Sequence, residues 1–527
     1  MNQYSENSPY SNRFTRELRI ALYVASIFLL LIIYCWKGHL RTHELIYLIG
    51  PRKFLNPDFL ANDITWAVRP QTTNLFDALI APLWLFFDGF VIANIGRLLT
   101  WVLSAFALAL LFFKLRLRWL AVVTGLILWL QFGQTIARCG LPYEGFQPKS
   151  LAYPLMFFSL YLALTERYYR AGLLAGLAVW FHVVVGGWSW FALGAAITLG
   201  SGHIRLGCLK KYLIISIPLV LISTIPVFVF HTSGGKAGAM SLIDKIYVTF
   251  AMPHCCDPDY FMDSKKWFMA AVVFVVLPLL LLIRKGRESK VLNVYVIALI
   301  VFWISGIVAS YYQAYWYLKT YPFQLAVGLL PLFYFIFAVD NLIGAADKNR
   351  LHNLLRLLSL SLLLYVIDSE NLIERAVHRP KLFMAEIEKY YQRGSVAYGE
   401  PAVYKWIRDN TPKNSVFITP VMQEFWMYAE RAQLAQFRHP PLNYRIIEWK
   451  KRLEGINKFK EFDKRGYRIA KGLNWNESRL TESELIRLGK LYGATHYLSR
   501  VRRKDLKEYE LYSGLTMFVY RVPERSG

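Results

Sequence analysis

Long apolar runs limit what this chain can fold into. A helix rises about 1.5 Å per residue, so about 20 apolar residues cross a hydrocarbon core of about 30 Å. Only 18% of the 527 residues are charged, against roughly a quarter in soluble domains. We therefore predict an α-helical polytopic membrane protein with about eleven transmembrane helices. The runs lie at residues 20–36, 90–113, 118–134, 150–165, 171–186, 187–202, 212–230, 267–283, 291–310, 321–340 and 353–368.

Short basic loops predict the orientation of these helices. Lys and Arg gather before the first run and after every second run that follows, and such loops mark the cytoplasmic side. The N-terminus is then cytoplasmic, and an odd number of spans places the C-terminus outside. The long segments 37–89, 231–266 and 370–527 share the outer side, where we expect the functional residues. The pair of runs at 171–202 requires a tight turn, which we place at Gly186-Gly187.

The composition changes near residue 381. Residues 382–527 contain 27 Lys+Arg and 17 Asp+Glu, a net charge of +10, and no long apolar run. Strands are predicted at 415–420, 496–499 and 517–522, and Thr481 with Glu484 forms a capping box that opens a helix. We predict a transmembrane domain at 1–380 and an extracytoplasmic (periplasmic) α/β domain at 381–527. It contains no glycine-rich phosphate loop, so no nucleotide site is indicated, and no nucleic-acid partner is expected.

The first outer loop carries two carboxylates, Asp58 and Asp63, followed by Arg69. A spacing of five residues on a helix turns about 500°, so the two carboxylates diverge by roughly 140°. They meet only if the segment is irregular. One interpretation is a general base for a hydroxyl at the membrane surface. The other is a pair of helix caps.

Two further clusters precede or end predicted spans. Arg138, Glu144, Gln147 and Lys149 form a polar segment directly before a helix N-terminus, an arrangement suited to an anionic head group. Anchoring of the span ends at the interface is the alternative. His182 lies near the outer end of a span, where an ionisable residue is a functional candidate. A neutral histidine bonded within the bundle is the rival interpretation.

Loop 231–266 carries Pro253-His254-Cys255-Cys256-Asp257, and an aromatic loop carries Trp316, Lys319 and Gln324. The crowded His, Cys and Asp residues lack the spacing of a zinc site, so a single His or Asp that contacts substrate or a divalent ion is favoured over zinc. In the aromatic loop, the rings suit a sugar face or a prenyl chain and Lys319 suits phosphate. An aromatic belt at the interface is the alternative.

The chain resembles the GT-C superfamily of polytopic glycosyltransferases, closest to uncharacterised bacterial members. The resemblance lies in the first-loop acids, in Glu144-x-x-Gln147-Pro148, in the stretch from Ala171 to His182 and Gly186-Gly187, and in Pro253-His254 with Asp257-Pro258. It extends to Trp406–Ile418 and Tyr492–Tyr497 of the C-terminal segment. The chain departs from the pattern at Val183, Cys255 and Lys319.

The resemblance implies an inverting enzyme of the bacterial inner membrane, acting in cell-envelope polysaccharide biosynthesis. It would move a sugar (hexose or pentose) from a polyprenyl-phosphate donor to a hydroxyl of a glycan, lipid or protein, with Asp58 or Asp63 as base. Some GT-C enzymes use Mg²⁺ or Mn²⁺ and others no metal, so a divalent cation stays open. The alternatives are a flippase for lipid-linked sugars and a non-catalytic assembly protein. Donor phosphate would be bound by Arg138, Lys149, His254 and Lys319, and substrate by Arg69, Glu144, Gln147, His182, Asp257, Trp316 and Gln324.

Overall fold

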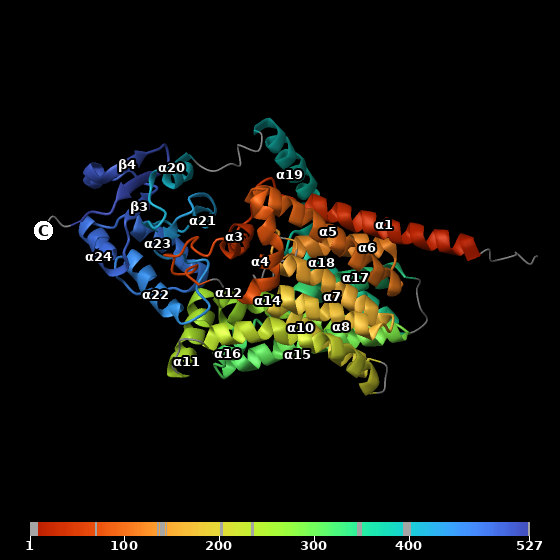
Figure 1. The fold of residues 1–527 in the computed structure, drawn as a ribbon. Helices are drawn as coiled ribbons and strands as arrows, with labels where there is room; N and C mark the ends of the chain where they lie inside the picture. Colours follow the sequence, from red (N-terminus) through yellow and green to blue (C-terminus); the bar gives the residue numbers. More distant parts are fainter. Residues whose placement is uncertain are drawn as a thin grey trace, which may run out of the picture.

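The protein consists of a helical bundle with a small α/β domain at one end (Figure 1). This is seen in a computed structural model that describes residues 9–68, 71–133, 136, 143, 145–200, 204–232, 237–344, 350–393 and 402–524. The N-terminal part of α1 projects from the end of the bundle that lies away from the domain. We call this end of the bundle the far end, and the opposite end, next to the domain, the domain end. The predicted fold class, helical and polytopic with a C-terminal sheet domain, is confirmed.

The predicted apolar runs lie largely on helices, and the run at 171–186 is interrupted at His182. Six of these helices, α1, α5, α10, α14, α15 and α17, are long and apolar enough to cross a membrane, and α6 and α9 are shorter apolar helices. The bundle helices are α1 (Pro9–Cys35), α5 (Gly89–Lys114), α6 (Trp119–Phe132), α7 (Pro148–Leu164), α8 (Tyr168–Phe181), α9 (Val183–Leu199), α10 (Leu206–Thr232), α14 (Ser264–Leu282), α15 (Arg287–Tyr311), α17 (Gln324–Ile343) and α18 (Arg350–Ser369).

The predicted turn at Gly186-Gly187 is wrong. The chain breaks at His182, which has extended backbone angles (φ −150°, ψ 98°) between α8 and α9. Gly186 instead lies inside α9, where an added Cβ would come within 2.3 Å of the backbone of Val179. The glycine is therefore needed for the close approach of the two helices, and the histidine makes the turn.

The short basic loops meet at the far end. Asp340, at the end of α17, is buried and accepts hydrogen bonds from the backbone N–H of Arg118 (2.9 Å) and from Arg284 Nη1 (2.5 Å). Glu166 pairs with Arg205 (3.3 Å) and Arg287 (2.9 Å). Loops 39 to 222 residues apart in the sequence are thus joined by hydrogen bonds and ion pairs, and the predicted grouping of the basic loops holds in space.

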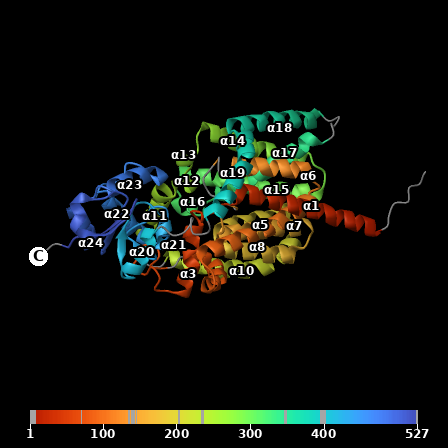
Figure 2. The ribbon, with the colours of Figure 1, turned by 90° about the horizontal axis from the view of Figure 1, so that it is seen from above.

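Short helices fill the space between the bundle and the C-terminal domain (Figures 1 and 2). The predicted long loops gather here, and α19 crosses the predicted domain boundary at residues 380 and 381. The short elements are α2 (Glu44–Tyr47), α3 (Ile49–Leu55), η1 (Gln71–Thr73), α4 (Asn74–Ile80), η2 (Ala81–Leu85), α11 (Ala237–Lys245), the π-helical η3 (Ile246–Ala251), α12 (Pro253–Cys256), α13 (Pro258–Phe261) and α16 (Tyr315–Leu318). The longer α19 (Leu372–Arg393) packs against α1, α6 and α18 of the bundle.

The C-terminal domain is built on a five-stranded sheet in the order β2-β1-β3-β5-β4. β1 pairs in parallel with β2 and β3, and β5 pairs antiparallel with β3 and β4. The strands are β1 (Val416–Ile418), β2 (Ala432–Gln433), β3 (His496–Ser499), β4 (Glu510–Ser513) and β5 (Phe518–Arg521), and the helical segments are α20 (Ala402–Asn410), α21 (Glu424–Tyr428), α22 (Arg445–Ile456), η5 (Gly466–Ile469), α23 (Ala470–Glu477), α24 (Glu482–Tyr492) and η6 (Lys504–Tyr509).

The sequence predicted three of these strands and missed the short β2 and β4. The capping box at the start of α24 is present: Thr481 Oγ1 accepts from the N–H of Glu484 (3.3 Å), and Glu484 Oε2 accepts from the N–H of Thr481 (2.7 Å). Gly493 ends the helix with φ +70°, a left-handed conformation that glycine adopts without steric cost.

Candidate functional site

Asp63 joins the first loop to the C-terminal domain. Its side chain is 1% exposed. Oδ1 accepts from the N–H groups of Thr65 (2.9 Å) and Trp66 (3.2 Å), and Oδ2 accepts from Trp426 Nε1 (2.6 Å) and the N–H of Gln433 (2.8 Å). Burial raises the pKa of Asp63, and the four N–H donors oppose that shift. The carboxylate thus accepts two hydrogen bonds from the first loop and two from the C-terminal domain.

Asp58 has a different setting five residues earlier. It is exposed, and its own N–H donates to Asn56 Oδ1 (3.1 Å). The two first-loop carboxylates therefore differ: one faces solvent and the other is buried with four donors. The segment between them is a series of turns, so the helical divergence considered from the sequence does not apply.

Aromatic rings of the first loop and the C-terminal domain meet beside Asp63. The His439 ring stacks on Trp66 with 5.2 Å between centroids, and Trp426 meets the Trp66 ring edge-on at 5.9 Å. Thr65 Oγ1 donates to the carbonyl oxygen of His439 (3.0 Å). Burial lowers the pKa of His439 to about 4, so this imidazole is neutral at pH 7.

Lys149 lies in the first turn of α7 and is 4% exposed. Its charge acts on His43, which precedes α2, and on His182 at the break between α8 and α9. Burial, Lys149, Arg41 and His439 together lower the pKa of His43 to about 3. A buried ammonium, two imidazoles and the N-terminus of a 17-residue helix thus lie near one another at the domain end, and a helix N-terminus favours negative charge.

Two predicted substrate residues line the same region. Gln147 is the N-cap of α7 and 1% exposed, and among the described residues its amide Nε2 has no hydrogen-bond partner. His182 Nδ1 accepts from the N–H of Val185 (3.2 Å) and caps α9. Buried N–H groups without partners are costly, which makes the Gln147 amide a candidate ligand contact within the described part of the chain.

His254 and Asp257 contact the C-terminal domain. The His254 ring lies 4.3 Å from the ring of Tyr467, and Asp257 bonds to Arg465. Burial raises the pKa of Asp257, and Arg465 opposes this shift. In this structure the two predicted residues hold α12 and α13 against η5.

Lys319 bonds to two partners, and its side chain is 13% exposed. Its Nζ donates to Asp244 Oδ1 (2.8 Å) and to the carbonyl oxygen of Leu442 (3.2 Å). Trp316 is 68% exposed beside it, and Gln324, at the start of α17, is buried. The predicted aromatic loop therefore contributes one exposed ring and one lysine that joins α11, α16 and the C-terminal domain.

Three predicted residues, Arg69, Arg138 and Glu144, lie outside the described residues.

The sequence did not predict the buried ion pair between Arg97 and Glu44. Arg97 of α5 donates to Glu44 Oε1 (2.6 Å) and also bonds Oε2, and Glu44 accepts from the N–H of Phe146 (2.7 Å). An arginine within an apolar run was the available signal. The pair fixes α2, which His43 precedes, and the segment before α7, which ends at Gln147.

The donor set does not fit a metal centre. In the part of the chain that the structure describes, no group of three or more His, Cys, Asp or Glu side chains is placed to hold a metal ion. The buried acids Asp63, Asp244 and Asp257 are each bonded to nitrogen donors instead.

Comparisons with known proteins concern the C-terminal domain and the whole fold. A family model described as a domain of unknown function (DUF6798) matches residues 399–456, and no curated protein matches the chain. The chain is similar to the crystal structure of ArnT from Cupriavidus metallidurans bound to undecaprenyl phosphate, with 13% identity and a TM-score of 0.45, over 96% of this chain and 98% of that one. It is also similar to the archaeal oligosaccharyltransferase AglB from Archaeoglobus fulgidus in complex with an inhibitory peptide and a dolichol-phosphate, with 12% identity and a TM-score of 0.45, over 93% and 70%. None of these matches assigns a residue or a substrate to this chain.

Proposed function

We propose that the chain is a GT-C-type membrane glycosyltransferase that moves a sugar from a polyprenyl-phosphate donor to an acceptor hydroxyl at the outer membrane face. The observation that carries the proposal is the group of Lys149, His43, His182 and the N-terminus of α7 at the domain end of a membrane bundle. These nitrogen donors suit a phosphate that leaves with a negative charge, and donors fixed before reaction are the usual electrostatic contribution.

The chemistry is a single displacement. The acceptor oxygen attacks the anomeric carbon, the bond from that carbon to the phosphate oxygen breaks, and its electron pair leaves with the phosphate. The acceptor proton passes to a first-loop carboxylate, and the configuration at the anomeric carbon inverts. Lys149 and Gln147 would bind the phosphate. No step is assigned to a metal.

Asp58 and Asp63 offer different properties to this step. Asp58 is open to a substrate, whereas Asp63 is buried beside the His439 and Trp66 rings and has a raised pKa. A pKa nearer to neutral favours a general base, but Asp63 would have to release one of its four donors.

The test measures transfer by the full-length protein in lipid nanodiscs from a radiolabelled polyprenyl-phosphate sugar. Either Asp58→Asn or Asp63→Asn is expected to reduce the rate at least 100-fold, the scale at which general-base catalysis acts. Asp259→Asn on α13 is the matched control with an unchanged rate. If both first-loop variants keep full activity, the base assignment fails. If the wild type transfers no sugar from any such donor, the enzyme is excluded and the flippase or assembly protein is favoured.

A further inference from the structure

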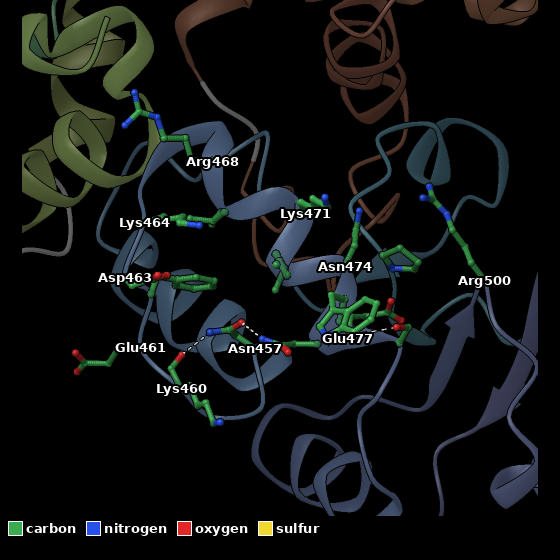
Figure 3. Close-up of a pocket in the computed structure, with 18 of the residues that line it drawn as sticks. Asn457, Lys460, Glu461, Asp463, Lys464, Arg468, Lys471, Asn474, Glu477 and Arg500 are labelled. Carbon is green, nitrogen blue, oxygen red and sulfur yellow. Dashed lines mark hydrogen bonds between the residues drawn. The ribbon is translucent and has the colours of Figure 1, made fainter.

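The C-terminal domain contains a pocket away from the Lys149 region. Its volume is about 750 Å³, within the range of about 300–1,000 Å³ found for small-molecule sites. It is formed by the loop after α22, by η5 and α23, and by the turn after β3 (Figure 3). None of the residues predicted from the sequence lines it.

Cations and an aromatic ring line this pocket. Lys460 and Lys464 lie on one side and Arg500 on the other, with Lys471 above (Figure 3). Trp475 is 60% exposed, and one of its faces is covered by the guanidinium of Arg479, 3.1 Å from the ring centroid. An indole held in this way presents a rigid apolar platform, whose negative face attracts the C–H bonds of a sugar ring.

Amide groups in the pocket are held in place by partners. Asn476 Nδ2 donates to Asn457 Oδ1 (2.8 Å), and Asn474 Oδ1 accepts from the N–H of Val421 (2.7 Å). Among the described residues nothing bonds to the amide nitrogen of Asn474 or to the amide oxygen of Asn476. One donor and one acceptor thus remain for a ligand that carries hydroxyl groups.

The one buried acid of the pocket carries little negative charge at neutral pH. Glu477 is 1% exposed, and its Oε1 has no hydrogen-bond partner in the described part of the chain. Burial raises the pKa of Glu477 to about 8, so the carboxyl is protonated at pH 7 and does not repel an anion. Glu461 and Asp463, both exposed, are then the only charged acids facing five cations among the lining residues.

The pocket adjoins the membrane part. Phe462 of its wall packs against Phe250 of η3 at 5.4 Å, and the Arg468 guanidinium covers the ring of Tyr260 of α13 at 4.5 Å. A long ligand bound here therefore lies next to η3 and α13.

We propose that this pocket binds an acidic saccharide and that the saccharide is the acceptor of the transfer reaction; the second part rests on the proposed function. The Trp475 ring, the oriented amides and the lysine and arginine side chains match a sugar with carboxylate or phosphate groups. Arg and Lys donors to such anions are charge-assisted and therefore strong.

The experiment measures binding by titration calorimetry on the full-length protein in nanodiscs. The probe is tetragalacturonate, and its fully methyl-esterified form is the uncharged probe of equal length. We expect the acid to bind at least 10-fold more tightly than the ester. The double variant Lys464→Gln/Lys471→Gln should lose that preference, and Trp475→Ala should weaken both probes. Lys504→Gln/Lys507→Gln, on η6 outside the pocket, removes the same charge and should change neither affinity.

Equal binding of acid and ester, or equal losses in the two double variants, overturns the pocket assignment. Tighter binding of a mononucleotide or an acidic peptide than of tetragalacturonate overturns it as well. Transfer is measured in parallel. If transfer occurs and Lys464→Gln/Lys471→Gln leaves the KM for the acceptor saccharide unchanged, the acceptor role is wrong while the proposed function stands. If the acid binds and no donor supports transfer, the saccharide site stands and the proposed function fails.

Discussion

The two ends of the helical bundle use charge differently. At the far end, Asp340 and Glu166 are bonded to arginines from neighbouring loops. At the domain end, the buried Lys149 lies with the imidazoles of His43 and His182. Carboxylate–guanidinium pairs join the loops at the far end. The domain end contains such pairs as well, Glu44 with Arg97 and Asp257 with Arg465, and it differs in the nitrogen donors suited to an anion that gather around Lys149. The comparison predicts a structural role for the charges of the far end and a role in the proposed reaction for those around Lys149.

The largest expected effect comes from the domain end. Lys149→Gln should lower the rate of sugar transfer at least about 100-fold, because removing one preorganised donor to a developing negative charge costs that much. The measurement is the transfer assay with a labelled polyprenyl-phosphate sugar, with protein amount checked by size-exclusion chromatography. Arg287→Gln at the far end is the matched control and should keep the wild-type rate within threefold. Equal losses in the two variants would remove the functional distinction between the ends.

The far end should respond in stability instead. Asp340→Asn weakens the bonds to Arg118 and Arg284 and is expected to lower the free energy of unfolding by about 1–3 kcal/mol. Thermal unfolding in detergent measures this effect, and transfer at 25 °C should stay near the wild-type rate. A rate loss comparable to that of Lys149→Gln, at unchanged stability, would contradict the assignment of this end to structure.

The smallest effect concerns pH. His439 has a folded pKa of about 4, against 6.5 ordinarily, so the unfolded chain binds its proton first as the pH falls. The stability contributed by the neutral ring is complete above pH 6.5 and is lost as the pH falls toward 4. The free energy of unfolding lost between pH 7 and pH 5.5 is about 1 kcal/mol. The His439→Gln variant should show a correspondingly smaller drop in unfolding free energy between pH 7 and pH 5.5. An unchanged pH dependence would show that the imidazole is not held neutral.

Local patterns in the sequence predicted much of the fold. Apolar runs located the bundle helices, and Thr481 with Glu484 located the start of α24. The turn at His182 was missed because glycine pairs favour turns, while here Gly186 serves close helix packing. The strand β2 has two residues, too few for a period-2 pattern.

The site was less predictable because its contacts join distant segments. Lys149 and Gln147 were found from a polar segment before a helix. Two of the four partners of Asp63, Trp426 and Gln433, lie more than 360 residues away, and no local pattern identifies them. His43 and His439 lie in unremarkable local sequence and become notable only through their shared surroundings with Lys149. The pocket around Trp475 likewise depends on the tertiary arrangement of three separate segments.

The bond between Asp63 and the C-terminal domain has a consequence for modularity. Two of the four donors to this buried carboxylate, Trp426 Nε1 and the N–H of Gln433, belong to the domain. A chain that ended after α19 would leave a carboxylate exposed at the joint with half of its donors missing. The membrane part and the C-terminal domain are therefore not interchangeable units, and a domain transplanted from a relative would have to bring matching donors at both positions.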